Sequence, residues 1–177
     1  MKTIVEFPAV AISGCLLGER VRYDGQDSFM PDLIECLEEE LNLVSLCPEV
    51  AIGLGVPRPP MHLVSQDGQI RAVGVEDGQK DFTERLFNYG AEIVKRFDNL
   101  SGYVFKSRSP SCGLKTTPIY KLTGGFALEK EPGSGIFAAT IVKLSPSLPV
   151  SDELGLMDPG ARRDFIEAVK QYNLNRS

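Results

Sequence analysis

Several marks of membrane-spanning and secreted proteins are missing from this sequence. No stretch approaches the roughly 18 consecutive apolar residues that identify a membrane-spanning helix. Residues 1–8 also lack the long apolar segment of a secretory signal peptide. We therefore expect a cytoplasmic protein that does not insert into a membrane.

A concentrated positive charge is missing as well. The 19 lysines and arginines are outnumbered by 24 acidic residues, which gives a formal net charge of -5. No block of basic residues could neutralise several phosphates at once, so a long nucleic acid is a disfavoured partner. The arginines are scattered among glycines and prolines, and this distribution is compatible with a small anionic ligand.

The four cysteines do not form the close C-x-x-C pairs that are frequent in structural zinc sites. A chain of 177 residues, 42% of them hydrophobic, has the composition of one ordinary globular domain, which we place at residues 1–177. Such a chain buries about 70% of the surface that its unfolded form exposes. Because a core of that size needs no covalent or metal staples, the cysteines require another explanation.

Short apolar runs alternate with segments of helical periodicity. We predict strands at residues 9–14, 43–46, 102–105 and 148–150, and helices at residues 31–41, 81–97, 135–143 and 159–172. Asp67-Gly68 predicts a small hairpin, and the glycine-rich residues 121–135 predict a mobile loop. The alternation indicates an α/β fold: a single domain whose mostly parallel sheet carries helices on both faces. In such folds ligands bind beyond the carboxyl ends of the strands.

Three of the cysteines come directly after predicted strands or close behind them. The topology should therefore bring Cys15, Cys47 and Cys112 to one edge of the sheet, despite their wide spacing in sequence. Cys36 lies inside a predicted helix, where we expect a plain core or half-buried thiol.

Spacing alone leaves several interpretations of the three cysteines open. A disulfide is disfavoured in a reducing compartment, and it would leave one thiol over. Structural zinc usually takes four protein ligands. Buried structural thiols are compatible with the spacing. So is an iron–sulfur cluster on three cysteines, in which one iron would stay open to water or substrate and act as a Lewis acid.

The residues around the cysteines resemble the 2-thiouracil desulfurase family. The matching segments are residues 13–18, 22–25, 47–50, 107–113, 133–139 and 148–153. These motifs are long and contain rare combinations, and the resemblance extends over nearly the whole chain.

The resemblance implies a Rossmann-like enzyme with a [4Fe-4S] cluster that removes sulfur from thiolated uracil without net redox and releases hydrogen sulfide. Carried over residue by residue, it assigns the cluster to Cys15, Cys47 and Cys112. Glu49 matches the acidic residue held responsible for proton transfer, and Ser109 matches a serine near the substrate.

Further residues are candidate substrate contacts: Tyr23, Asp24, Arg58, Lys106 and Ser111. Each also has a structural alternative. Tyr23 and Asp24 lie in a predicted turn, and both Ser109 and Ser111 could satisfy backbone groups of their loop. Arg58 and Lys106 could pair with carboxylates or with a substrate phosphate. Glu49 could cap the turn after Pro48.

Two departures from the family pattern bear on the substrate. Residues 53–58 are similar to the form found in longer relatives that carry an extra C-terminal domain and resemble enzymes acting on 4-thiouridine. Since this chain ends at Ser177 and is acidic, we expect a free base, nucleoside or nucleotide rather than transfer RNA. His62 stands where relatives often have glutamate, and we expect a surface or hydrogen-bonded residue rather than a metal ligand.

The expected substrates are 4-thiouracil, 4-thiouridine and its monophosphate, or 2-thiouracil. Two alternatives belong to other functional classes. One is a binding module that senses a nucleotide or iron status without turnover, and the other is a structural or zinc-binding protein.

Overall fold

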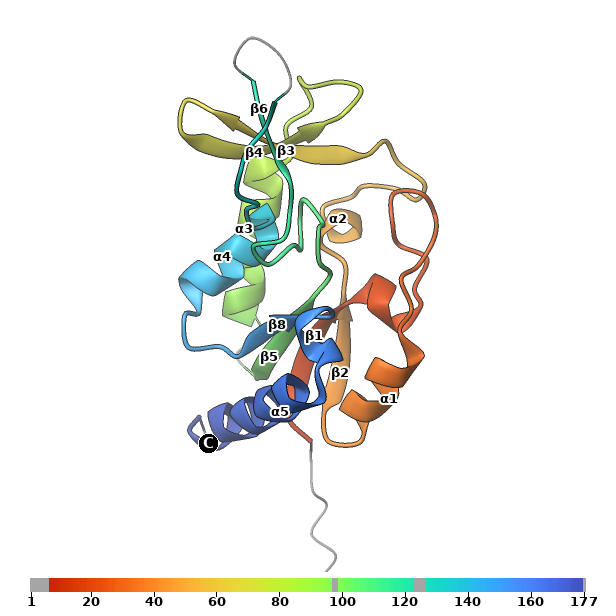
Figure 1. Ribbon diagram of the computed structural model, residues 1–177, viewed down its shortest axis with the longest axis vertical. Helices are drawn as coiled ribbons and strands as arrows, with labels where there is room; N and C mark the ends of the chain where they lie inside the picture. The colour runs from red at the N-terminus through yellow and green to blue at the C-terminus, as the bar shows by residue number, and fades with distance from the viewer. Residues whose placement is uncertain (1–6, 97–98, 123–126, 177) are drawn as a thin grey trace, which may run out of the picture.

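The computed structural model describes residues 7–96, 99–122 and 127–176, and the described residues form two four-stranded sheets flanked by helices (Figure 1). The first sheet consists of β1 (Ala9–Ser13), β2 (Asn42–Leu46), β5 (Leu100–Phe105) and β8 (Val150–Asp152). Its strand order is β2-β1-β5-β8, and all neighbouring strands are parallel. The carboxyl ends of β1, β2 and β5 therefore lie at the same edge.

Helices cover both faces of this sheet, as the alternating pattern predicted. On one face, α1 (Pro31–Glu38) and α5 (Pro159–Leu174) belong to the core cluster that includes Val10 and Ile12. On the other face, α3 (Thr83–Arg96) and α4 (Ile136–Leu144) pack in the cluster that includes Ala11. Successive side chains of β1 thus enter opposite cores, as the two-residue period of a strand requires.

A second, mixed sheet was not predicted. It consists of β3 (Met61–Gln66), β4 (Gln69–Gly74), β6 (Ile119–Lys121) and β7 (Ala127–Leu128), in the order β4-β3-β6-β7. The hairpin prediction is confirmed: Asp67 and Gly68 both have positive φ, 50° and 76°, as a two-residue turn of the type I′ class needs.

The predicted loop at residues 121–135 is wrong at Lys121 and at residues 127–128, which belong to strands, whereas residues 129–135 lie outside the named strands and helices. Lys121 ends β6, and β7 pairs antiparallel with β6. Residues 123–126 of that prediction lie outside the described residues. β6 pairs in turn with β3, more than fifty positions earlier in the chain. A segment of this composition is extended here because a distant strand supplies its hydrogen-bond partners, and local sequence does not reveal that partner.

The other differences concern element boundaries. The first helix ends at Glu38 instead of residue 41, and the last strand begins at Val150 instead of residue 148. Three single-turn helices were not predicted: η1 (Gly14–Leu17), α2 (Pro48–Ala51) and η2 (Gly155–Met157). Elements of three or four residues contain too few positions to show a helical period. Position 97, the predicted end of the second helix, is outside the described residues.

No helix in the described part of the chain combines the length and apolar character that crossing a membrane requires. The longest, α5, has 16 residues and begins with Pro159. Its start is fixed by Asp158, whose side chain accepts a hydrogen bond from the N–H of Ala161 at 2.8 Å.

A substitution of Phe137 in α4 would test the packing of the sheet against α3 and α4. Phe137 is fully buried, and its ring contacts Tyr89 at 5.5 Å, Tyr103 at 5.8 Å and Phe105 at 6.4 Å between centroids. We expect Phe137→Ala to lower the free energy of unfolding by about 3–5 kcal/mol, measured by urea denaturation, because it leaves a cavity among these rings. Phe87→Ala, at a 44% exposed position of α3, should have a much smaller effect. Equal effects of the two substitutions would contradict this packing.

Candidate functional site

A cavity of about 480 Å³ lies at the carboxyl ends of β1, β2 and β5. Its wall includes residues 13–15, 46–49, 106–110 and Cys112, and residues 21–23, Arg58, Pro60 and Met61 complete it. The volume falls within the range of small-molecule sites. The position is the one that the strand topology favours.

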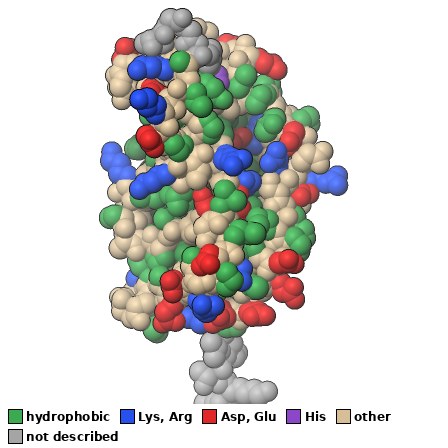
Figure 2. All heavy atoms as spheres, viewed as in Figure 1, with side chains coloured by type: hydrophobic (Ala, Val, Ile, Leu, Met, Phe, Trp, Pro, Cys, Tyr) green, Lys and Arg blue, Asp and Glu red, His purple; other side chains and the backbone are tan. Residues whose placement is uncertain are grey.

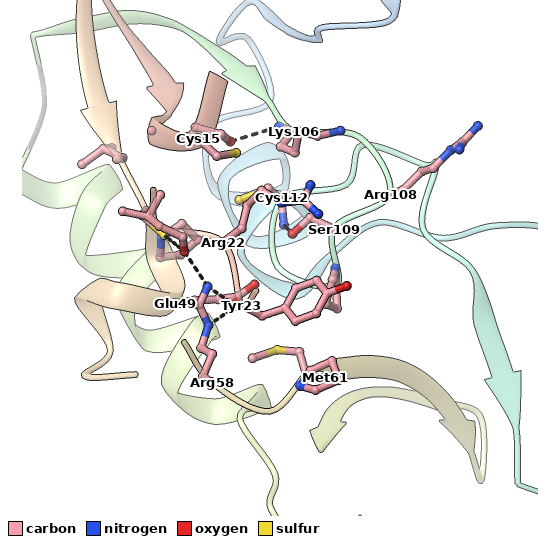
Figure 3. A pocket seen from close by; sticks show the side chains of 18 of the residues that line it. Cys15, Arg22, Tyr23, Glu49, Arg58, Met61, Lys106, Arg108, Ser109 and Cys112 are labelled. Carbon is pink, nitrogen blue, oxygen red and sulfur yellow. Dashed lines mark hydrogen bonds and ion pairs between the residues drawn. The ribbon is translucent and has the colours of Figure 1, made fainter. Parts of the chain in front are cut away.

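The cavity brings Cys15, Cys47 and Cys112 together. Cys15 is buried in η1 directly after β1, and Cys47 occupies the N-cap position of α2 directly after β2. Cys112 is buried in the loop that follows β5. Figure 3 shows the thiols of Cys15 and Cys112 directed toward a common space. Cys36 is half-buried in α1 and outside the cavity lining, as expected for a plain thiol.

The three thiols are poor acids in the protein without a bound metal. Burial, followed by the neighbouring Cys47, raises the pKa of Cys15 to about 11. Burial also raises the pKa of Cys47 and holds the pKa of Cys112 well above its ordinary value. At neutral pH the thiols are therefore protonated. A metal group that binds them as thiolates must displace these protons, which makes its affinity depend on pH.

The three cysteines are compatible with a cluster as well as with separate thiols. Among the described residues, no three His, Cys, Asp or Glu side chains are arranged to hold one metal ion. A cluster distributes its protein ligands over several iron atoms, so its thiolates need not converge on one point. Three cysteines around a shared cavity fit this requirement.

The loop that carries Cys112 is held from inside by Ser109. The Ser109 hydroxyl accepts hydrogen bonds from the N–H groups of Ser111 and Cys112, at 3.2 and 3.0 Å. Ser109 also lines the cavity. It therefore fixes the loop, as the structural alternative stated, while its hydroxyl remains next to the space that a ligand would occupy.

The same loop rests on the beginning of α4. The N–H groups of Ile136 and Ala138 donate to the carbonyls of Pro110 and Ser111 at 3.0 and 3.1 Å. A Cβ atom at Gly135 would come within 2.4 Å of the backbone of Ser111, so only glycine permits this approach. The first turn of α4 is thus occupied by the cysteine loop.

Glu49 lies in the first turn of α2, and both of its carboxylate oxygens are engaged. Oε2 accepts a hydrogen bond from Nε of Arg58 at 2.8 Å and forms a salt bridge with Nη2 of the same side chain at 2.7 Å. Oε1 accepts from the hydroxyl of Ser111 at 2.8 Å. Glu49 is therefore not a helix cap, since Cys47 occupies the N-cap position and the carboxylate is turned toward side chains.

Two predicted substrate contacts prove to be partners of this carboxylate. The side chain of Arg58 is only 7% exposed and forms a salt bridge with Glu49, the alternative stated for it above. Ser111 is fully buried and does not line the cavity. Arg58 lines the cavity, but hydrogen bonds within the protein use its guanidinium.

Lys106 is also paired, with Glu153 just after β8. Glu153 is 3% exposed and accepts hydrogen bonds from Lys106 Nζ, from the Ser107 N–H at 2.7 Å and from the Ser107 hydroxyl at 2.6 Å. Burial by itself would raise the pKa of Glu153, but the hydrogen bonds from Lys106 and Ser107 outweigh it and lower the pKa. Glu153 was not predicted as a site residue, although it belongs to one of the family segments.

The remaining wall includes residues of two loops and the first residue of β3. Tyr23 lines the cavity as predicted, and Figure 3 shows it facing the side where Met61 lies. Asp24 does not line it and instead pairs with Arg22 at 2.9 Å. Met61, Arg22 and Arg108 are lining residues that the sequence prediction missed. A methionine after a proline run carries no chemical signature, whereas Arg22 was visible in the family segment 22–25.

His62 follows Met61 in β3 but is outside the cavity lining. Its ring lies 5.4 Å from the ring of Tyr120, and burial lowers the pKa of its imidazole.

The charge near the cavity is opposite in sign to that of the whole chain. Four basic side chains line it, Arg22, Arg58, Lys106 and Arg108, with Glu49 as the one acidic lining residue among those described. On the face shown in Figure 2, acidic side chains gather mainly at the end where α1 and α5 lie. The net charge of -5 is thus carried largely away from the cavity.

Comparison with known proteins gives consistent matches. A family model described as 2-thiouracil desulfurase matches residues 10–153. The uncharacterized protein YbbK of Bacillus subtilis (strain 168) is 32% identical over 139 residues, which cover 75% of this chain and 88% of YbbK. A solved structure of TudS, a [4Fe-4S]-dependent thiouracil desulfidase, matches with a TM-score of 0.65 and 27% identity, over 88% of this chain and 96% of that one.

The buried carboxylate of Glu153 should make stability depend on pH. The pKa of Glu153 is lower in the folded protein than its ordinary value of 4.5. The ionised carboxylate therefore stabilises the fold fully above about pH 4.5, and this stabilisation is lost as the pH falls through the lowered pKa. Urea denaturation between pH 3 and 7 should show Glu153→Gln about 1.5–3 kcal/mol less stable at pH 7, with a gap that narrows on acidification. Glu38→Gln, at an exposed position, should show no such gap. A gap that does not change with pH would contradict the assigned role of the charge.

Proposed function

The chain belongs to the 2-thiouracil desulfurase family, and we propose that it is a desulfidase whose [4Fe-4S] cluster is bound by Cys15, Cys47 and Cys112. The observation that carries the proposal is that one cavity is lined by all three cysteines of the family segments together with Glu49 and Ser109. The matching structure of TudS is that of a [4Fe-4S]-dependent thiouracil desulfidase, and this supports the same cofactor here.

The substrate in this proposal is a thiolated uracil, as the free base, nucleoside or nucleotide. The overall change replaces a C=S group by C=O: water supplies the oxygen and two protons leave with the sulfur as hydrogen sulfide, so no electrons are gained or lost. When bound by three cysteines, the cluster would offer a Lewis-acidic iron with affinity for the soft thiocarbonyl sulfur.

Glu49 is the proposed proton carrier. Its carboxylate lines the cavity two residues after Cys47, so it can reach a water molecule next to the substrate. It would take a proton from this water as oxygen adds to the ring carbon, and later deliver it to the ring nitrogen or the departing sulfur. Arg58 and Ser111 fix the orientation of the carboxylate for both transfers.

The other lining residues would position the pyrimidine. Ser109 presents its hydroxyl at the cavity wall, while Tyr23 and Met61 supply apolar surface for the ring. The basic side chains Lys106 and Arg108 would favour a substrate that carries negative charge. The cavity volume of about 480 Å³ is in the range of small-molecule sites, whereas transfer RNA is disfavoured by the acidic remainder of the chain.

Metal content tests the cofactor. Protein prepared without oxygen should contain about four iron and four acid-labile sulfide per chain, and Cys112→Ala should lose most of both, because two thiolates hold a cluster poorly. Cys36→Ala, outside the cavity, should retain the wild-type content. Absence of iron after anaerobic reconstitution, or retention of iron by Cys112→Ala, would contradict the proposed ligand set. Zinc in place of iron would favour the structural alternative.

Turnover tests the role of Glu49 and separates an enzyme from a binding module. Loaded wild-type protein should release sulfide from at least one of 4-thiouracil, 4-thiouridine, its monophosphate and 2-thiouracil. Glu49→Gln keeps the shape of the side chain but not its basicity, and should slow release by about 10²- to 10⁴-fold with iron content unchanged.

Glu92→Gln is the matched control, because this exposed α3 carboxylate pairs with Arg96 away from the cavity. It should turn over at the wild-type rate. Binding of these compounds without sulfide release by the wild type would instead indicate a sensing module.

A further inference from the structure

Arg58 connects separate segments of the cavity wall through one buried guanidinium. Its Nε donates a hydrogen bond to the Glu49 carboxylate at 2.8 Å, and its Nη1 donates to the carbonyl of Gly55 at 3.0 Å. Its Nη2 donates to the carbonyl of Val21 at 2.8 Å and lies 2.7 Å from Glu49 Oε2 in a salt bridge. The backbone N–H of Arg58 adds a bond to the carbonyl of Tyr23 at 2.8 Å. Side chain and backbone together therefore bind the segment that follows Cys15.

The same connection extends to the two other cysteine-bearing segments. Glu49 lies two residues after Cys47, and the hydroxyl that donates to its second oxygen belongs to Ser111, the residue before Cys112. The Cys47 thiol, at 3.9 Å, also faces the carbonyl of Val21 that Arg58 binds. A chain of contacts from residues 21–23 through Arg58 and Glu49 to Ser111 thus joins all three segments.

We infer that Arg58 is a positioning residue, which acts on the reaction by holding Glu49 and residues 21–23 against the cavity, and not by binding substrate. Each of its three guanidinium nitrogens already donates to an acceptor within the protein, and its side chain is 7% exposed. The effect on turnover rests on the proposed desulfidase function, whereas the ordering of the cavity wall does not.

The geometry requires arginine specifically. The planar guanidinium of Arg58 donates to one carboxylate and two carbonyls that lie in different directions. A lysine ammonium is a single nitrogen on a flexible chain and cannot bind all three acceptors at once. Removal of the guanidinium also leaves the partly buried Glu49 carboxylate without its countercharge, which is costly. Arg58→Lys should therefore retain only part of the function, and Arg58→Met should retain least.

Hydrogen exchange of the intact chain tests the ordering. In Arg58→Met we expect the amides of Arg22, Gly25 and Leu54 to exchange at least about tenfold faster than in the wild type, because the segments they stabilise lose their common anchor. Amides of β1 and β5 should be unchanged, which shows that the variant is folded. Arg71→Met is the control, since Arg71 makes a similar pair with Asp81 outside the cavity. Unchanged exchange at the three amides, or equal acceleration in Arg71→Met, would overturn the inference.

A double-mutant cycle tests whether Arg58 acts through Glu49. In loaded protein matched for iron, Arg58→Met should lower kcat by about 10²-fold with a smaller change in KM, and Arg58→Lys should recover part of the loss. In the Glu49→Gln background, Arg58→Met should change kcat by less than about twofold, since the group it orients is already absent. The positioning role would be overturned if Arg58→Met lowered kcat by the same factor in the Glu49→Gln background as in the wild type. It would also be overturned if Arg58→Met changed only KM. If the wild type shows no sulfide release, the proposed function fails, and the exchange measurement still decides whether Arg58 orders the wall.

Discussion

Parallel pairing of β1 with β2 and β5 is the constraint on which the rest of the site depends. Ala11 pairs with Val44 on one side and with Tyr103 on the other, so the three strands advance in the same direction and end at one edge. Cys15 and Cys47 each follow a strand end within two residues. Without this register, residues separated by 32 and 65 positions would have no reason to meet. The other contacts of the site orient the three cysteine-bearing segments that these strands bring together.

Two acidic residues perform much of that orientation. Glu49 connects α2 to Arg58 and Ser111, and Glu153 connects the end of β8 to Lys106 and Ser107 after β5. Each accepts several charge-assisted hydrogen bonds, which are stronger and more directional than neutral ones. The cavity wall is made of loops, and loops lack a regular ladder of backbone bonds. The buried carboxylate of Glu153 and the partly buried one of Glu49 hold such segments in place, and Glu49 is also the proposed proton carrier.

The second sheet is the main difference between the structure and the fold predicted from the sequence. The hairpin of β3 and β4 was predicted from its turn, but its pairing with β6 was not. This sheet matters for the site because Met61, the first residue of β3, lines the cavity. The cavity is therefore bounded on one side by the carboxyl ends of the parallel sheet and on another by the beginning of the second sheet.

The sequence by itself determined the α/β class, the helices on both faces, the hairpin and the group of cysteines at one edge. All of these follow from local signals: hydrophobic period, turn residues and the position of a residue relative to a strand end. The tertiary structure alone decided that Arg58 and Lys106 pair with Glu49 and Glu153, that Ser111 and Asp24 lie outside the cavity lining, and that Met61 and Arg108 lie within it. These pairs and lining residues depend on which side chains lie next to each other in the folded protein. Segments far apart in the chain pack together to form these contacts, so no local sequence pattern predicts them.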